Sequence, residues 1–195
     1  LVEAAGIALP HIDFGGGLGI AYNGETPPAA DALCQQILAL LDARGMGQRQ
    51  LVFEPGRSLV GNAGVCVTEV LYLKHGQSKN FCIVDAAMND LPRPAMYQAY
   101  HQIVPLEQSA AAQASTYDVV GPVCESGDWL GNERRLSVQQ GDLLAVMSAG
   151  AYCMSMASNY NSRARAAEVL VADGQVHLIG EREPFAALVQ RERML

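Results

Sequence analysis

The sequence is poor in basic and aromatic residues, and it contains no long uninterrupted apolar run. Of its 195 residues, 13 are lysine or arginine and 20 are aspartate or glutamate, which gives a formal net charge of -7. A nucleic-acid-binding domain carries a clustered basic face, so this acidic balance excludes that class. No run approaches the ~18 apolar residues of a membrane-spanning helix. The first residues also lack the basic and apolar regions of a signal peptide.

Cysteine is present, but without a recognisable pattern. The five cysteines are odd in number and include no Cys-x-x-Cys pair, so neither a disulfide framework nor a zinc site is indicated. A reducing, cytoplasmic environment is therefore expected. The four histidines show no metal-ligand spacing, and we expect no metal. No Ser/His/Asp arrangement and no pair of carboxylates typical of glycosidases stands out.

Half of the residues are hydrophobic, which excludes a disordered chain. The length suits one domain, or one domain and part of another. Residues 7–14 predict a buried strand. Residues 29–45 predict an amphipathic helix, with apolar residues at 33, 37, 38, 40 and 41 and Gly45 as its stop. Residues 50–58 predict a second short strand that ends at a Pro-Gly break. This strand–helix–strand order favours a parallel pair.

The pattern changes near residue 62. Strand-like runs occupy residues 64–75, 80–86, 116–123 and 142–148, and short helices are plausible at 93–102 and 184–193. Asp173-Gly174 lies between two alternating runs, which is the strongest short-range hairpin signal. We therefore expect an antiparallel β domain over residues 62–195, following a separate unit over residues 1–61.

The first unit is too small to stand alone as an α/β domain. Two parallel strands with open edges are not independently stable, and a complete (β/α)₈ barrel takes about 250 residues. We expect residues 1–61 to be the end of such a barrel, with its beginning absent. The chain starts with leucine instead of methionine, which agrees with this expectation.

Three consecutive glycines, Gly15 to Gly17, follow the first predicted strand. Glycine loses the most conformational freedom on folding, so three in a row indicate that something approaches bare backbone. Loops after barrel strands commonly bind phosphate through backbone N–H groups. The chain has no Gly-Lys-Ser/Thr sequence, so a nucleotide P-loop is not indicated. A plain tight turn is the alternative that these residues leave open.

Six short stretches of the sequence are distinctive when they are taken together. They are HIDFGGGLGI (11–20), FEPGRSLVGNAG (53–64), DAAMNDLPRPAMY (85–97), CESGD (124–128), GAY (150–152) and NYNSRARAAEVLV (159–171). In this order they resemble the fold-type III pyridoxal-phosphate-dependent decarboxylases, and among these the diaminopimelate decarboxylases. The resemblance covers nearly the whole chain. It implies the end of a TIM-type (β/α)₈ barrel followed by a C-terminal antiparallel β-barrel or sandwich domain.

The resemblance also implies pyridoxal 5′-phosphate as the cofactor. The glycines would hold its phosphate, and Glu54 would keep its pyridine nitrogen protonated. Arg57 would meet the phosphate or a substrate carboxylate. The implied cofactor-binding residues are Gly15, Gly16, Gly17, Glu54, Gly56, Arg57 and Tyr152. From the residues alone, Glu-Pro-Gly-Arg is more often an exposed turn, and Tyr152 is as readily a packed core aromatic.

The substrate-binding residues implied by the resemblance are Arg57, Arg93, Tyr97, Glu125 and Tyr152. Arg93 and Tyr97 are four apart on a predicted helix and would bind a carboxylate together. Cys124 would be the catalytic acid that reprotonates the reacting carbon, on a loop that enters the partner's active site in a homodimer. Glu125 would bind the distal ammonium group. The plain alternatives are a surface arginine, a half-buried tyrosine and a small buried cysteine.

The predicted reaction converts meso-2,6-diaminopimelate to L-lysine and CO₂, in a cytoplasmic enzyme of lysine biosynthesis. Pyridoxal phosphate chemistry needs a lysine, yet the chain contains only Lys74 and Lys79. Both flank an expected turn of the β domain. We therefore expect the Schiff-base lysine outside this chain, and no activity from the chain alone. A decarboxylase acting on ornithine, arginine or carboxynorspermidine and a non-catalytic binding homologue are the alternatives. Ornithine enzymes usually carry aspartate where this chain has Glu125, which favours diaminopimelate.

Overall fold

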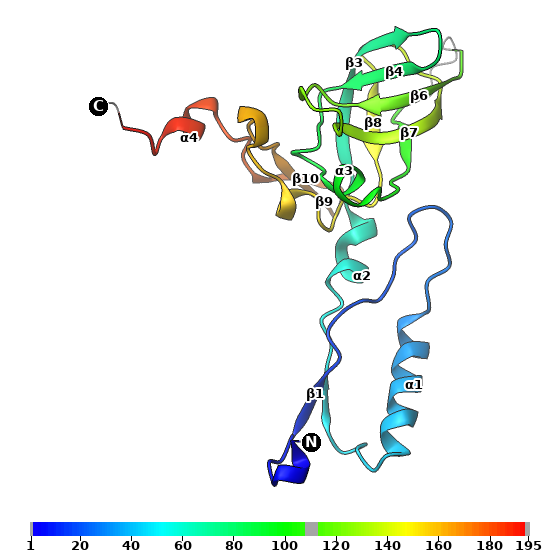
Figure 1. The fold of residues 1–195 in the computed structure, drawn as a ribbon, viewed down its shortest axis with the longest axis vertical. Coiled ribbons are helices and arrows are strands. Elements are labelled where there is room, and N and C mark those ends of the chain that lie inside the picture. The colour runs from blue at the N-terminus through cyan, green and yellow to red at the C-terminus, as the bar shows by residue number, and fades with distance from the viewer. Residues whose placement is uncertain (1, 108–112, 194–195) are drawn as a thin grey trace.

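The structure is a computed structural model that describes residues 2–107 and 113–193. It has an elongated N-terminal part, a curled six-stranded sheet and a projecting C-terminal hairpin (Figure 1). Within the described residues, no helix has the length and apolar character needed to cross a membrane.

The N-terminal part contains the predicted strand–helix–strand unit. After a short 3-10 turn at Glu3–Ala5, the elements are β1 (His11–Asp13), α1 (Ala30–Asp42) and β2 (Gln50–Val52). β1 and β2 pair in parallel, which confirms the predicted strand direction. Gly45 adopts a φ of 69° just beyond α1, as a helix stop requires.

Two details of this unit differ from the prediction. The strand expected to be buried over residues 7–14 is largely exposed, because β2 alone pairs with β1. The second strand also ends earlier than residue 58. Its continuation is α2 (Gly56–Val60), followed by a 3-10 turn at Gly61–Ala63. Pro55 stands at the N-terminal cap of α2, where a missing N–H has no cost.

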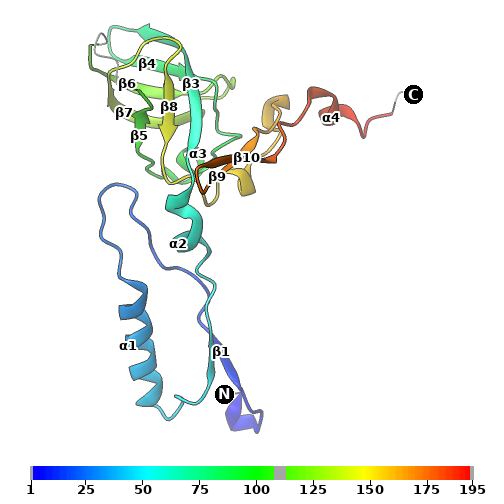
Figure 2. The same cartoon turned by 180° about the vertical axis from the view of Figure 1, so that it is seen from behind.

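The sheet of the C-terminal part has six strands in the order β5-β8-β3-β4-β6-β7. They are β3 (Cys66–His75), β4 (Asn80–Val84), β5 (Ile103–Pro105), β6 (Ser115–Val120), β7 (Trp129–Leu136) and β8 (Leu143–Val146). The sheet curls into a nearly closed barrel, with β5 and β7 as the two edge strands (Figure 2). Sequence runs predicted four of these strands, whereas β5 and β7 were missed.

The expectation of a purely antiparallel domain is wrong at one position. β4 and β6 pair in parallel, with Phe81 opposite Asp118, so the sheet is mixed. Parallel neighbours need a long crossover connection, and the connection here carries α3 (Arg93–Tyr97) and β5.

The core lies inside the barrel. Its fully buried side chains come from strands on opposite sides of the barrel and from Leu91, which precedes α3. The strand residues are Val70, Cys82, Val84, Val119, Leu130, Leu144 and Val146. Along β3, Thr68 and Val70 are buried whereas Glu69 and Leu71 are exposed, which is the alternation that one buried sheet face produces.

The predicted hairpin is confirmed. β9 (Glu168–Ala172) and β10 (Gln175–Gly180) pair antiparallel. Asp173 and Gly174 both have positive φ, 51° and 71°, as a type I′ turn requires. α3 and α4 (Phe185–Val189) are shorter than the helices predicted at 93–102 and 184–193. Gln98 ends α3 in the left-handed conformation.

Candidate functional site

The glycine run lies at the carboxyl end of β1, directly beside Glu54. Because β1 and β2 are parallel, the segments that follow them both begin at the same end of the strand pair. Gly15 and Gly17 have φ values of 64° and 89°, which side chains disfavour. A Cβ on Gly16 would lie 2.4 Å from the carbonyl oxygen of Glu54. The backbone of Gly16 therefore packs directly against the backbone of Glu54 in the same chain, and a side chain at position 16 would not fit.

The backbone in this loop has the properties of an anion site. The Gly15 amide donates to Oδ1 of Asp13 at 2.7 Å, and the Glu54 amide donates to the Gly15 carbonyl at 2.7 Å. Within the described residues, the amides of Gly16 and Gly17 donate to no acceptor. A Cβ on Gly56 would meet nothing within 4 Å. Uncommitted amides beside open space fit a phosphate group.

Arg57 and Tyr152 lie on two segments that touch. Arg57 is half-buried on α2, and in the described part of the chain its guanidinium has no hydrogen bond or ion pair. A Cβ on Gly150 would lie 1.8 Å from the Val60 carbonyl oxygen, and the Gly150 amide donates to the Gly61 carbonyl at 3.0 Å. Tyr152 follows this contact with a φ of 59° and is 46% exposed, so it is not a packed core aromatic.

Arg93 is held by a histidine that the sequence did not single out. Nη1 of Arg93 lies 2.9 Å from Nε2 of His101, and Nδ1 of His101 lies 2.8 Å from the Met147 carbonyl oxygen. The guanidinium also stacks 4.8 Å from the ring centroid of Tyr22. Burial lowers the pKa of His101, and the nearby positive charges of Arg93 and Arg134 lower it further. The imidazole is therefore neutral at pH 7.

Tyr97 does not join this cluster. Its side chain is 61% exposed, while Arg93 is half-buried at the other end of the single-turn helix α3. The structure places the two on one helix, as predicted, but shows no contact between them. Tyr22 carried no sequence signal, and His101 was one of four histidines without a pattern.

The Cys124–Asp128 loop connects β6 and β7. Cys124 is the one exposed cysteine of the five, whereas Cys82 is fully buried and burial raises its pKa to about 12. Glu125 is exposed and accepts a hydrogen bond from the Tyr160 hydroxyl at 2.9 Å. The hydrogen bond to this carboxylate raises the pKa of Tyr160, and the negative charge of the carboxylate raises it further.

Asp128 gives this loop its shape. Its carboxylate is buried and accepts the amides of Met88 and Val123, each at 2.7 Å. A Cβ on Gly121 would lie 2.5 Å from one Asp128 oxygen. Asp128 and Tyr160 belong to two of the sequence motifs, but no local pattern indicated that they contact Met88 and Glu125.

The site residues fall into two groups. Gly15–Gly17 and Glu54 lie at the ends of β1 and β2, and α2 follows with Arg57, whereas Cys124 and Glu125 lie on the β6–β7 loop of the barrel (Figure 1). Within the described residues, no hydrogen bond or ion pair joins the two groups. The N-terminal part and the barrel meet elsewhere: Gly150 contacts Val60 and Gly61, and Tyr22 packs against Arg93 and His101.

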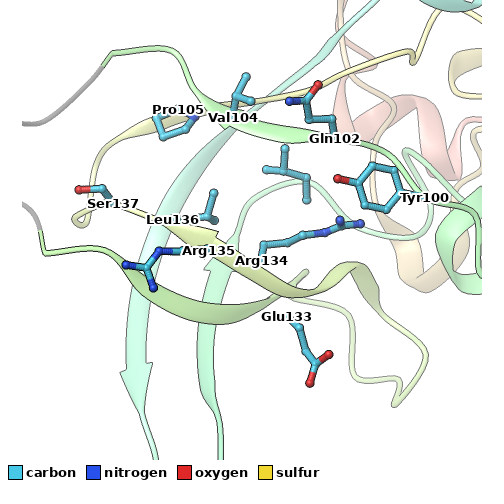
Figure 3. Close-up of a pocket in the computed structure, with 10 residues that line it drawn as sticks. Tyr100, Gln102, Val104, Pro105, Glu133, Arg134, Arg135, Leu136 and Ser137 are labelled. Carbon is cyan, nitrogen blue, oxygen red and sulfur yellow. The ribbon is translucent and has the colours of Figure 1, made fainter. Parts of the chain in front are cut away.

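A separate cavity opens at the seam between β5 and β7 (Figure 3). Its volume is about 540 Å³. Arg134 lies along it, with its guanidinium carbon 3.9 Å from the ring centroid of Tyr100. None of the residues predicted to bind cofactor or substrate lines this cavity, so it is distinct from both groups.

Both lysines lie where the sequence indicates. Lys74 is on β3, and Lys79 precedes β4, with its Nζ 2.7 Å from Oδ2 of Asp118. Neither is on β1 or β2. Over the described ranges, no group of three or more potential ligands could hold a metal ion.

Residues 18–150 match the family model described as pyridoxal-dependent decarboxylase, C-terminal sheet domain. The chain is 49% identical to a diaminopimelate decarboxylase of Vibrio cholerae, over 100% of this chain and 46% of that protein. It is 52% identical to one of Neisseria meningitidis serogroup A, over 98% of this chain and 46% of that protein. The chain thus spans about half the length of the curated relatives it matches.

Solved structures give the same picture. A diaminopimelate decarboxylase from M. jannaschii in co-complex with L-lysine superposes with a TM-score of 0.92 at 37% identity, covering 100% of this chain and 45% of that one. One from Helicobacter pylori complexed with L-lysine gives a TM-score of 0.89 at 40% identity, covering 98% and 46%.

Proposed function

We propose, because this chain belongs to the pyridoxal-dependent decarboxylase family, that the whole protein converts meso-2,6-diaminopimelate to L-lysine and CO₂. The observation that carries the proposal is the similarity of nearly the whole chain, about half identical, to diaminopimelate decarboxylases of two bacteria. The five free cysteines support a cytoplasmic location for this reaction.

In this proposal, residues 1–61 are the end of a TIM-type (β/α)₈ barrel and residues 62–195 are the C-terminal β domain. The parallel pairing of β1 with β2 supports the first assignment, because a TIM barrel is built from parallel strands joined by helices. The open edges of both strands are positions where further barrel strands would pair.

Pyridoxal 5′-phosphate, when bound, supplies a ring that takes up the electron pair left by departing CO₂. The uncommitted amides of Gly16 and Gly17 would hold its phosphate, with Arg57 and Tyr152 beside them. Gly56 leaves room for that approach. The Glu54 carboxylate would accept the pyridine N–H and keep it protonated. The Schiff-base lysine lies outside this chain, because Lys79 is paired with Asp118 and neither lysine is on β1 or β2.

The substrate would be bound at both ends. The guanidinium of Arg93 is a planar donor that suits a carboxylate, and the exposed Tyr97 hydroxyl lies on the same short helix. Glu125 would accept the distal ammonium through the oxygen that Tyr160 leaves free. The exposed thiol of Cys124 would donate the proton to the reacting carbon.

We propose a homodimer, because the two groups of site residues lie apart within one chain. A second copy would bring its Cys124–Asp128 loop to the glycine loop of the first. The exposure of both Cys124 and Glu125 supports this arrangement, since a residue that acts across an interface must be accessible on its own chain.

The test is to purify the whole protein with pyridoxal phosphate and to measure CO₂ release from meso-diaminopimelate, ornithine, arginine and carboxynorspermidine. We expect diaminopimelate to have the highest kcat/KM, with L-lysine as the product. Residues 1–195 alone should release no CO₂. Faster turnover of ornithine would overturn the substrate assignment, and no turnover of any amino acid would favour a non-catalytic homologue.

A further inference from the structure

His101 is a fully buried titratable side chain to which the proposed function gives no role. It lies between α3 and β5, and its side chain has no exposed surface. Each of its ring nitrogens has a partner, Arg93 at one and the Met147 carbonyl at the other. The ring also meets Tyr22 edge-on, with the ring centroids 5.2 Å apart.

The partners determine which nitrogen carries the proton. A carbonyl oxygen can only accept, so Nδ1 must donate to Met147. A guanidinium can only donate, so Nε2 must accept from Arg93. A doubly protonated ring would place two donors face to face. The arrangement is therefore compatible only with the neutral tautomer that has its proton on Nδ1.

Arg93 keeps its full positive charge in this arrangement. Within the described residues it forms no ion pair with a carboxylate. Its other neighbours are the neutral imidazole and the face of the Tyr22 ring. An aspartate at position 101 would also hold the guanidinium, but it would neutralise the charge and compete with any anion that binds there. A neutral acceptor fixes the guanidinium and leaves its remaining N–H groups for an incoming anion.

We propose that His101 is a positioning residue that holds the Arg93 guanidinium, as a fixed neutral acceptor, to receive a carboxylate of the substrate. This inference rests on the proposed function, because it takes the substrate of Arg93 to be an amino acid. His101 acts through Arg93 and does not itself contact the substrate.

Two substitutions in the whole protein separate a positioning role from a structural one. His101→Asn can still donate to the Met147 carbonyl but is too short to accept from Arg93. His101→Gln can place an amide oxygen near the position of Nε2. Loss of one hydrogen bond to a charged group weakens an interaction by roughly 10-fold or more. We expect His101→Asn to raise the KM for diaminopimelate by about that factor, with kcat changed less than about threefold. His101→Gln should recover most of the loss.

An equal fall of kcat for both variants without a KM effect, or better function for His101→Asn than for His101→Gln, would overturn the proposal. A second measurement does not depend on how the variants fold. Nitrogen-15 NMR of histidine-labelled wild-type protein should show one ring that is neutral at pH 7, with its proton on Nδ1. A His101 ring that is doubly protonated at this pH, or that carries its proton on Nε2, would also refute it.

The failure of the proposed function would look different. If the wild-type protein prefers another amino acid, the substrate assignment falls, and the two His101 variants are then compared on the KM of that preferred substrate. If it decarboxylates diaminopimelate but both variants leave the KM unchanged, only the role of His101 falls.

Discussion

Cys124 differs from the other cysteines in its surroundings. Cys82 is buried in the barrel core, and Cys66 and Cys153 pack against it, whereas Cys124 is exposed on the β6–β7 loop. A thiol that serves only as a small apolar side chain gains nothing from exposure. The exposure supports its proposed role as the proton donor.

In the whole protein, Cys124→Ala should lower the turnover of diaminopimelate by roughly 100-fold or more, the range for a lost acid–base group. Binding of pyridoxal phosphate, followed by its absorbance, should not change. Cys34→Ala on α1 is the matched control, because it removes a half-buried thiol far from the loop in sequence. An unchanged rate for Cys124→Ala would exclude this residue from the reaction.

Sequence motifs singled out the residues that we propose to bind and react, but not the residues that contact them. Glu125 is bound by Tyr160, which is 35 positions away, and Arg93 is held by His101 together with the Met147 carbonyl. Such partners meet only through the tertiary fold, so spacing along the chain carries no trace of them. The glycine run predicted that some group lies close to the backbone there. At Gly16 that group includes the backbone of Glu54 in the same chain.

At the scale of elements, local signals predicted the segments whose structure is decided locally. α1 has its apolar stripe and its glycine stop, and the β9–β10 hairpin has its Asp-Gly turn. β7 was missed because it reads Trp-Leu-Gly-Asn-Glu-Arg-Arg-Leu, and its charged residues interrupt the alternation. The parallel pairing of β4 with β6 depends on the closure of the sheet, so the separate runs could not indicate it.

One carboxylate joins the two segments that flank the β9–β10 hairpin. Glu183, just after β10, accepts the Arg165 amide at 3.0 Å and pairs with the Arg165 guanidinium at 3.3 Å. It also accepts the Asn159 side-chain amide. These contacts, with the Arg165 amide first, lower the pKa of Glu183 to about 2. Glu183 therefore links the irregular segment before β9 to the residues that follow β10.

The sign of the pH effect follows from the lowered pKa. The stabilisation by Glu183 is complete above the ordinary glutamate pKa, and it is lost as the pH falls towards about 2. The protection of the β9 and β10 amides against hydrogen exchange, expressed relative to the intrinsic exchange rate at each pH, should therefore decrease between about pH 4.5 and 2. Glu183→Gln should remove this acid-dependent part, while Glu181→Gln, a nearby exposed position, should keep it. The same acid dependence in both variants would contradict this role of Glu183.

At the scale of the whole molecule, many large apolar side chains are exposed in the described part of the chain. Several apolar side chains outside the barrel are about half to three-quarters exposed: Leu59, Val169, Val171, Val176, Leu178, Ile179 and Phe185. Monomeric proteins rarely expose apolar patches of more than a few hundred Å². Since the chain spans about half the length of its relatives, we expect the rest of the protein and a second copy to cover these residues.

Residues 1–195 prepared alone should therefore self-associate and bind the dye anilinonaphthalene sulfonate, as exposed apolar surface does. The whole protein should bind much less dye per chain and form a defined oligomer. Dye fluorescence and sedimentation velocity measure the two properties. A monodisperse 195-residue chain that binds no dye would show that these side chains need no cover.

The parallel pairing of β4 with β6 also affects the order of folding. The hairpins β3–β4, β6–β7 and β9–β10 join strands that are close in sequence, whereas Phe81 must meet Asp118 across the whole connection that carries Arg93 and His101. Closing a longer loop costs more entropy, and contacts between distant residues form slowly. The Arg93–His101 pair is local, but Nδ1 of His101 also needs the carbonyl of Met147, which is 46 positions away on the far side of this connection. We therefore expect the complete arrangement around Arg93 to form late in folding. The ability to bind a carboxylate would then appear together with the closed barrel, and no partly folded form would have it.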